Sequence, residues 1–274
     1  MPAASKRQSM KPLPRLCTVL AFLAACLTAQ ADDSRPTAGG DNGRFPWLPP
    51  EWAARVVYYQ TFENADGKAE INAINAQTEV AAPRRVNNGM SGFAYAAKEP
   101  TKTAVAVSSP ALSVDKPLTV MTWFRVETPM TESAGFGILW INSRNSYIAN
   151  FVRGKGEWCG LKRPTCVSQI QNFPGIRNIN HPWGGSAWFR PGEWHHAAIT
   201  VSGARQVRIY WDGKPRQSFN IHGRTFREGD TDTVRIGNPE WGGHPIALDE
   251  IVIVNRALDE EEIADYVFTA RKLR

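Results

Sequence analysis

The chain has 274 residues, of which 42% are hydrophobic and 10% aromatic, so it is long enough to bury one sizeable core. Its formal charge is +6, but four of its 32 bases lie in the first 15 residues, and residues 1–31 contain no acid. Without those four, 28 bases face 26 acids. Such a balanced chain lacks the clustered basic stripe of a nucleic-acid-binding protein, so we exclude nucleic acid as a partner.

The N-terminal segment has the layout of a secretory signal peptide. Its basic residues precede an apolar run over residues 16–27, and the small residues Ala29 and Ala31 mark a cleavage site. An apolar run of about 12 residues is too short to span a bilayer stably, and no later stretch reaches ~18, so we expect no transmembrane helix. We expect residues 1–31 to be removed and the chain to be exported to the periplasm or the extracellular space.

A second interpretation of the same segment centres on Cys26. Residues 23–26 read Leu-Ala-Ala-Cys and resemble a bacterial lipobox, in which the cysteine is lipidated and becomes the first mature residue. The alternatives are therefore a signal peptide cut after Ala31 and an outer-membrane lipoprotein anchored at Cys26. Residues 32–50 are rich in Asp, Gly and Pro, which is typical of a linker. We expect a linker over residues 32–53 and a single domain over residues 54–274.

Short runs rich in β-branched and aromatic residues follow one another along the rest of the chain, separated by Gly, Pro, Asn and Asp. An Asp-Gly pair at Asp212 and Gly213 lies between two such runs and predicts a type I′ hairpin. Many short strands with almost no helix predict an all-β sandwich or jelly roll. The predicted strands are 56–62, 103–108, 118–126, 136–141, 147–152, 194–201, 207–211, 234–236 and 246–254.

One helix is predicted at the C-terminal end. Asp259 can cap it, and Glu262, three residues later, completes a capping box. The apolar residues after this turn recur at helical spacing and share one face: Ile263, Tyr266, Val267 and Ala270. We interpret the acidic cluster 259–262 as the first turn of this helix and not as a catalytic group.

Two cysteines lie outside the predicted signal peptide, Cys159 and Cys166. In an oxidising compartment, such a close pair is typical of a disulfide that closes a short loop. A zinc site is the alternative, but zinc pairs are spaced more closely and need a second pair of ligands, which the sequence lacks. We therefore predict a Cys159–Cys166 disulfide.

The C-terminal third carries a recognisable order of motifs. Residues 193–198 read Glu-Trp-His-His-Ala-Ala and lead into the strand 207–214, and residues 255–258 read Asn-Arg-Ala-Leu. Together with Ile-Gly at 236–237, Leu-Asp-Glu-Ile at 248–251, and upstream matches at 59–63 and 118–124, this order resembles the laminin-G-like, concanavalin A-like lectin/glucanase domains of secreted bacterial proteins. The resemblance covers about residues 56–270 and is weakest over 142–192. It implies a two-sheet antiparallel jelly-roll sandwich, but this fold hosts lectins, adhesion modules and glycosidases alike.

Nothing in the sequence matches the catalytic motifs of this superfamily. Its glycoside hydrolases place two carboxylates on one strand face, whereas Asp249 and Glu250 are adjacent and strand alternation puts them on opposite faces. His195 and His196 are adjacent as well, so they cannot bind one metal ion together. We therefore expect a domain that is not an enzyme.

The resemblance also suggests calcium, which such domains often hold and which needs several hard oxygen ligands. The first and last strands of a jelly roll commonly neighbour each other, so Glu63 after the first strand can meet Asp249 on the last. Our hypothesis places Ca²⁺ at Glu63, Asn64 and Asp249. The alternative is that these carboxylates only accept hydrogen bonds from nearby backbone amides.

Sugars stack on aromatic side chains, and loops carry function more often than cores do. Five residues in segments unlike strands are the candidates for binding carbohydrate: Trp158, His181, Trp183, Trp188 and Trp241. The alternative is that the tryptophans close the ends of the sandwich. We interpret the chain as a non-catalytic module that binds carbohydrate or a surface polymer outside the cytoplasm. The alternatives are an envelope protein–protein or adhesion module and, third, a glycan-cleaving hydrolase.

Overall fold

The computed structural model describes residues 48–52, 54–64, 66–80, 84–90, 92–96, 104–112, 116–130, 135–143, 146–154, 165–171, 179–182, 190–202, 206–221, 233–241 and 244–274, all within the unit Phe45–Arg274. Its strands are β1 (Val56–Gln60), β2 (Ile71–Asn72), β3 (Gln77–Val80), β4 (Arg84–Val86), β5 (Ala94–Ala96), β6 (Val105–Ser108), β7 (Leu118–Val126), β8 (Gly135–Ser143), β9 (Ser146–Arg153), β10 (Thr165–Gln171), β11 (Ile179–Pro182), β12 (Trp194–Val201), β13 (Gln206–Trp211), β14 (Lys214–Asn220), β15 (Thr233–Trp241) and β16 (Ile246–Val254). The helices are the 3-10 turn η1 (Pro50–Trp52) and α1 (Glu260–Leu273).

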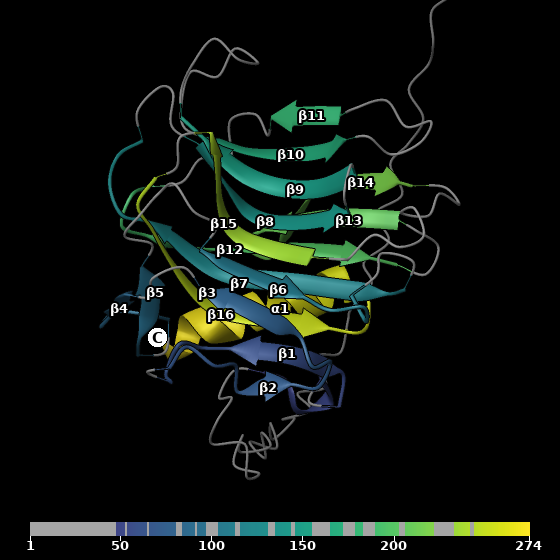
Figure 1. Cartoon of the computed structure of the whole chain (residues 1–274). Helices are drawn as coiled ribbons and strands as arrows, with labels where there is room; N and C mark the ends of the chain where they lie inside the picture. Colours follow the sequence, from purple (N-terminus) through teal and green to yellow (C-terminus); the bar gives the residue numbers. More distant parts are fainter. Residues whose placement is uncertain are drawn as a thin grey trace, which may run out of the picture. The chain divides into compact units, whose positions relative to one another are not determined.

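The strands form two antiparallel sheets that pack face to face (Figure 1). The first sheet has nine strands, in the order β14-β13-β12-β7-β16-β1-β2, with β5 paired to β16 and β4 paired to β5. The second has seven strands, in the order β11-β10-β9-β8-β15-β6-β3. The short strands β2 and β3 are each the last strand at one edge of their sheet. The predicted two-sheet antiparallel sandwich with a C-terminal helix is therefore confirmed.

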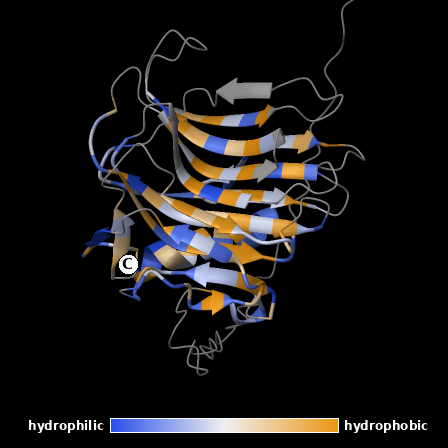
Figure 2. Cartoon of the chain, viewed as in Figure 1, coloured by the Kyte–Doolittle hydropathy of each residue, from blue (hydrophilic) through white to orange (hydrophobic). Residues whose placement is uncertain are grey.

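Alternating side chains fill two layers of core. On β7, Val120 and Phe124 face the second sheet, whereas Met121 and Trp123 face outward, toward α1. Helix α1 covers that outer face with four buried residues, Ile263, Tyr266, Val267 and Ala270. Figure 2 shows that hydrophobic residues recur along the strands of both sheets. The central strands β7 and β16 are therefore buried on both faces along their whole length.

The helix begins where its sequence predicted. Asp259 accepts a 2.9 Å hydrogen bond from the backbone amide of Glu262, whose carboxylate accepts one of the same length from the Asp259 amide. This capping box satisfies two amide groups that have no partner inside the helix. The apolar face of α1 is the predicted one. None of the helices in the described part of the chain is long and apolar enough to cross a membrane.

The turn between β13 and β14 is also the predicted one. Asp212 has φ 50° and Gly213 has φ 77°, and two consecutive positive φ values are what a type I′ turn requires. The tight turn brings β14 back along β13. It also holds Asp212 beside β12 and the end of α1.

One expectation about β16 is wrong. Leu248 and Ile251 both face the space between the sheets, so two residues, not one, lie between consecutive inward positions. The register against β7 shifts between Asp249 and Val252, and Glu250 has φ 50°. This β-bulge puts Asp249 and Glu250 on the same, outer face of the sheet, whereas regular alternation would have separated them.

Several strands lie in segments where the sequence predicted none. These are the short strands β2 to β5, and β10 and β11 within the region where the family resemblance is weakest. Strand β10 pairs with β9 along its whole length, from Thr165 opposite Arg153 to Gln171 opposite Tyr147. Both sheets therefore contain strands that the sequence did not predict.

Candidate functional site

The residues predicted to bind sugar fall mostly outside the part that the structure describes. Trp158, Trp183 and Trp188 lie outside the described residues. His181 belongs to β11, opposite Ser168, and Trp241 ends β15, opposite Gly135, and only their backbones are described. The aromatic platform therefore stays a prediction.

The cysteine prediction meets a different arrangement. The thiol of Cys166 is free, fully buried, and part of the core between the two sheets, where burial raises its pKa well above the ordinary value. No disulfide forms among the described residues. Cys159 lies outside them, so the pairing of Cys159 with Cys166 stays a prediction.

The adjacent histidines face opposite ways, as predicted. His195 packs against Phe124 and Trp211 in the core between the sheets, with ring centroids 5.9 and 5.8 Å away. His196 packs against Trp123 and Tyr266 under α1, at 5.1 and 5.4 Å. The two imidazoles cannot share one metal ion.

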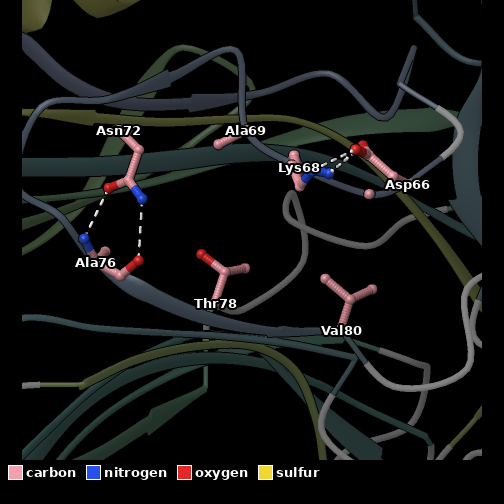
Figure 3. A pocket seen from close by; sticks show the side chains of 8 residues that line it. Asp66, Lys68, Ala69, Asn72, Ala76, Thr78 and Val80 are labelled. Atoms are coloured by element: carbon pink, nitrogen blue, oxygen red, sulfur yellow. Dashed lines mark hydrogen bonds and ion pairs between the residues drawn. The ribbon is translucent and has the colours of Figure 1, made fainter.

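Sequence reasoning missed a cavity of about 610 Å³ beside the edge strands β2 and β3, which we name the edge groove. Its volume falls in the ~300–1,000 Å³ range of small-molecule sites. The groove is lined by Asp66, Gly67, Lys68, Ala69, Asn72, Ala76, Thr78 and Val80 (Figure 3). Because these residues come from a loop, a two-residue strand and an edge strand, no apolar periodicity in the sequence pointed to them.

One wall of the edge groove is held by a turn. The Asn72 side chain donates to the Ala76 carbonyl at 3.0 Å and accepts from the Ala76 amide at 2.7 Å, and these bonds are drawn in Figure 3. This two-way bond fixes the connection between β2 and β3 and keeps the small side chain of Ala76 on the wall. The groove is therefore shaped before any ligand arrives.

The opposite rim carries an exposed ion pair. Lys68 Nζ lies 3.0 Å from Asp66 Oδ2, and the Lys68 amide donates to Asp66 Oδ1 at 3.0 Å. The hydrogen bond from that amide, followed by the one from the Lys68 side chain, lowers the pKa of Asp66. Both side chains are more than half exposed, so the pair contributes little to stability and its groups are accessible to a ligand.

A second cavity, of about 510 Å³, lies at the C-terminal end of α1, and we name it the helix-end groove. It is lined by Met90, Trp123, Gly192, Glu193, Trp194, His195, Asp212, Arg271 and Arg274. Within the lining, Arg271 pairs with Asp212 at 2.7 Å, and Glu193 pairs with Arg190 outside the lining at 3.5 Å. We take the edge groove, the larger of these two cavities, as the candidate site.

Glu63 and Asp249, the predicted calcium ligands, meet one loop. Asp249 Oδ2 accepts from the Met90 amide at 2.6 Å, and Glu63 Oε1 accepts from the Phe93 amide at 2.8 Å. The contact is tight, because a side chain added at Gly89 would put its Cβ 2.5 Å from Asp249 Oδ2. The structure thus brings the first and last strands together as expected.

The same contacts do not assemble a set of calcium ligands. The Asn64 side chain donates instead to the Lys68 carbonyl and to Glu70. Calcium takes six to eight oxygens, and the described residues contain no group of three or more His, Cys, Asp or Glu that could hold a metal. The bonds to backbone amides account for the placing of both carboxylates, and calcium stays a proposal.

Asp249 and Glu250 share a face of the sheet but do not form a catalytic pair. Both are buried on the outer face of the first sheet, and neither lines the edge groove or the helix-end groove. Glu250 accepts a hydrogen bond from the Tyr59 hydroxyl, and burial, followed by the negative charge of Glu250, raises the pKa of Tyr59. General acid–base chemistry on a sugar needs carboxyl groups within reach of the substrate, which these are not.

Comparisons with known proteins agree with this fold. The family described as the concanavalin A-like lectin/glucanases superfamily matches residues 99–264, more than half of the chain, so the chain belongs to this family. No curated protein matches the sequence significantly.

Solved structures with the same fold include domains of two toxins and of an arabinanase. The binding domain of the Paraclostridial Mosquitocidal Protein 1 superposes with a TM-score of 0.57 at 16% identity, covering 78% of this chain and 52% of that one. Domain 4 of an extracellular arabinanase from Geobacillus stearothermophilus, solved with arabinotriose, gives 0.53 at 16%, covering 78% and 98%. The ligand-binding domain of botulinum neurotoxin serotype D, solved with N-acetylneuraminic acid, gives 0.55 at 13%, covering 78% and 50%. The chain spans about half the length of the toxin domains, and the likeness shows the fold.

Proposed function

We propose that the chain is a non-catalytic binding domain that takes a carbohydrate or a surface polymer in the edge groove and acts outside the cytoplasm. The observation that carries the proposal is the groove itself, an open cavity of ligand size with hydrogen-bonding groups on its walls and an ion pair on its rim. Two structures of the same fold were solved with saccharides bound, which supports a saccharide as the ligand class. Export rests on the N-terminal segment of the sequence.

A glycan array is the experiment that tests this proposal. The wild-type chain should bind at least one saccharide, and Ala69→Tyr, which fills the edge groove with a ring, should weaken that binding at least ~10-fold because the ligand and the ring cannot occupy the same volume. Thr269→Tyr, which adds the same ring at an exposed position on α1, should leave the array unchanged. Circular dichroism should give both variants the wild-type spectrum.

The array also separates the alternatives. A chain that binds no saccharide but captures an envelope protein is the adhesion module, as the receptor-binding toxin domains of the same fold suggest. Release of reducing sugar from any glycan that binds would identify a hydrolase. The burial of Asp249 and Glu250 away from both grooves argues against that third outcome.

A further inference from the structure

The hydrogen-bond directions at the floor of the edge groove are fixed by a chain of four residues. Gln60 is fully buried, and its amide nitrogen lies 2.6 Å from the Gly67 carbonyl oxygen. A carbonyl oxygen can only accept, so the Gln60 nitrogen must be the donor and the Gln60 oxygen must face the other way, toward Tyr58. The orientation of the Gln60 amide follows from this contact.

The next link is the Tyr58 hydroxyl, which donates to Gln60 Oε1 at 2.7 Å. A phenol carries a single O–H, and the hydrogen of Tyr58 is used in this bond to Gln60. Burial raises the pKa of Tyr58 to about 12, so the phenol stays protonated at neutral pH. Tyr58 can therefore act only as the acceptor in its other contact.

That other contact is with Thr78, whose Oγ1 lies 3.1 Å from the Tyr58 oxygen. Because Tyr58 has no second hydrogen to give, Thr78 must donate its only one. The Thr78 hydroxyl, which lines the edge groove, then has lone pairs to offer to a ligand and no hydrogen. The interior of the sandwich thus sets the polarity of a surface site.

The charges around the groove favour the same kind of ligand. The lining contains one base, Lys68, and one acid, Asp66, while the acids Glu70 and Glu79 of the same segment lie outside the lining. Asp66 on the rim adds two acceptor oxygens, one of which accepts from the Lys68 amide while the other pairs with the Lys68 ammonium, which is 81% exposed. An anionic group in this groove would meet acceptor oxygens, and the one cation of the lining is exposed to solvent screening and already paired.

We propose that the edge groove recognises uncharged saccharides by accepting hydrogen bonds from their hydroxyl groups, with Thr78 Oγ1 and Asp66 as acceptors, and that it discriminates against anionic sugars. Sugar hydroxyls are donors, whereas carboxylate groups are acceptors only. The small apolar side chains of Ala69, Ala76 and Val80 leave room for the C–H face of a sugar ring. This inference rests on the proposed function and names the ligand class of the same site.

The test compares neutral and anionic probes in matched form. Arabinotriose, cellotriose and lactose are the uncharged probes, and 3′-sialyllactose and N-acetylneuraminic acid are the anionic ones, each titrated calorimetrically at about 50 and about 500 mM NaCl. We expect at least one uncharged probe to bind with a Kd that changes less than ~2-fold with salt, because no ion pair forms. We expect the sialylated probes to bind at least ~10-fold more weakly.

Three variants tie the result to Thr78. Thr78→Val keeps the shape but removes the acceptor and should weaken the uncharged probe about 5–10-fold, the size of one hydrogen bond. Thr78→Ser restores the hydroxyl and should lie within ~2-fold of wild type. Thr269→Val, an exposed position on α1, is the control for the substitution itself.

The outcomes separate this inference from the proposed function. If an anionic probe binds in a salt-dependent way and Ala69→Tyr abolishes that binding, the proposed function stands and the inference is overturned. If the Thr78→Val variant binds the neutral probe as tightly as the wild type does, Thr78 is not an acceptor for the ligand. A chain that binds no saccharide overturns both.

Discussion

His195 Nδ1 lies 2.8 Å from Asp212 Oδ2, at the point where β12, the β13–β14 turn and the end of α1 meet. A carboxylate can only accept, so His195 carries its proton on Nδ1. The other oxygen, Asp212 Oδ1, accepts from the His196 amide at 2.9 Å and from Arg271 at 2.7 Å. One side chain thus joins both faces of the first sheet and the helix that covers it.

Replacing Asp212 by Asn should lower the free energy of unfolding by about 2–3 kcal/mol, because charged hydrogen bonds in a largely buried place are lost. Burial acts to raise the pKa of Asp212, but the bond from His195 and the charges of His195 and Arg271 outweigh it, so the pKa is lowered. A depressed folded-state pKa gives stability that is present above ~3.8 and lost as pH falls through the lower folded value. Urea unfolding at about pH 7 and about pH 3 measures both effects, and Asp265→Asn on exposed helix surface is the control.

A second pH effect comes from His196. It is fully buried, neither ring nitrogen has a hydrogen-bond partner among the described residues, and burial lowers its pKa to about 3. In the unfolded chain a histidine titrates near 6.5, so between about that pH and about 3 the unfolded state binds one more proton than the folded state. The free energy of unfolding should fall by up to ~1.4 kcal/mol per pH unit across this window from His196.

His196→Phe isolates this contribution. Phenylalanine keeps an aromatic ring against Trp123 and Tyr266 but cannot take up a proton. The difference in unfolding free energy between the wild type and the variant should grow as pH falls from about 6.5 to about 4, in favour of the variant. A difference that stays constant over this range would mean that His196 is protonated in the folded state.

The core between the sheets contains a polar pair that the packing does not explain. Asn150 on β9 and Ser168 on β10 are directly opposite each other and fully buried, and within the described part of the chain both amide atoms and the hydroxyl lack a hydrogen-bond partner. Buried polar groups without partners each cost roughly 1–3 kcal/mol. The double variant Asn150→Leu/Ser168→Ala should therefore raise the melting temperature by several degrees, as calorimetry would show. A drop would mean that internal water satisfies the pair.

The fold could be predicted because its signals are local. Along the strand 118–126, successive residues face opposite sides of the sheet, and the structure buries both sides. Asp212 and Gly213 have the two consecutive positive φ values that a type I′ turn requires. The capping box at Asp259 fixes where α1 begins. Each signal depends on residues close together in the sequence, and each is confirmed.

The candidate site could not be predicted for the opposite reason. The edge groove joins Asp66 and Lys68 to Thr78 through two strands of two and four residues, too short to show a period. The bulge at Glu250 breaks the alternation rule through a positive φ at a residue other than glycine, which no local pattern announces. The positions of the groove residues and of the bulge at Glu250 are set by tertiary packing.

Calcium at Glu63 and Asp249 predicts a stability that depends on the ion. Bound calcium at about 100-fold above its Kd adds about 2.7 kcal/mol to the folded state, so the melting temperature in about 5 mM CaCl2 should exceed that in EGTA by several degrees. Asp249→Asn also keeps only one of the two acceptor oxygens that bind the Met90 and Glu250 amides, so its absolute melting temperature falls in both buffers. The informative quantity is the difference between buffers, which should vanish in Asp249→Asn and persist in Asp265→Asn. Equal melting temperatures of the wild type in calcium and in EGTA would leave both carboxylates as amide acceptors that hold the loop.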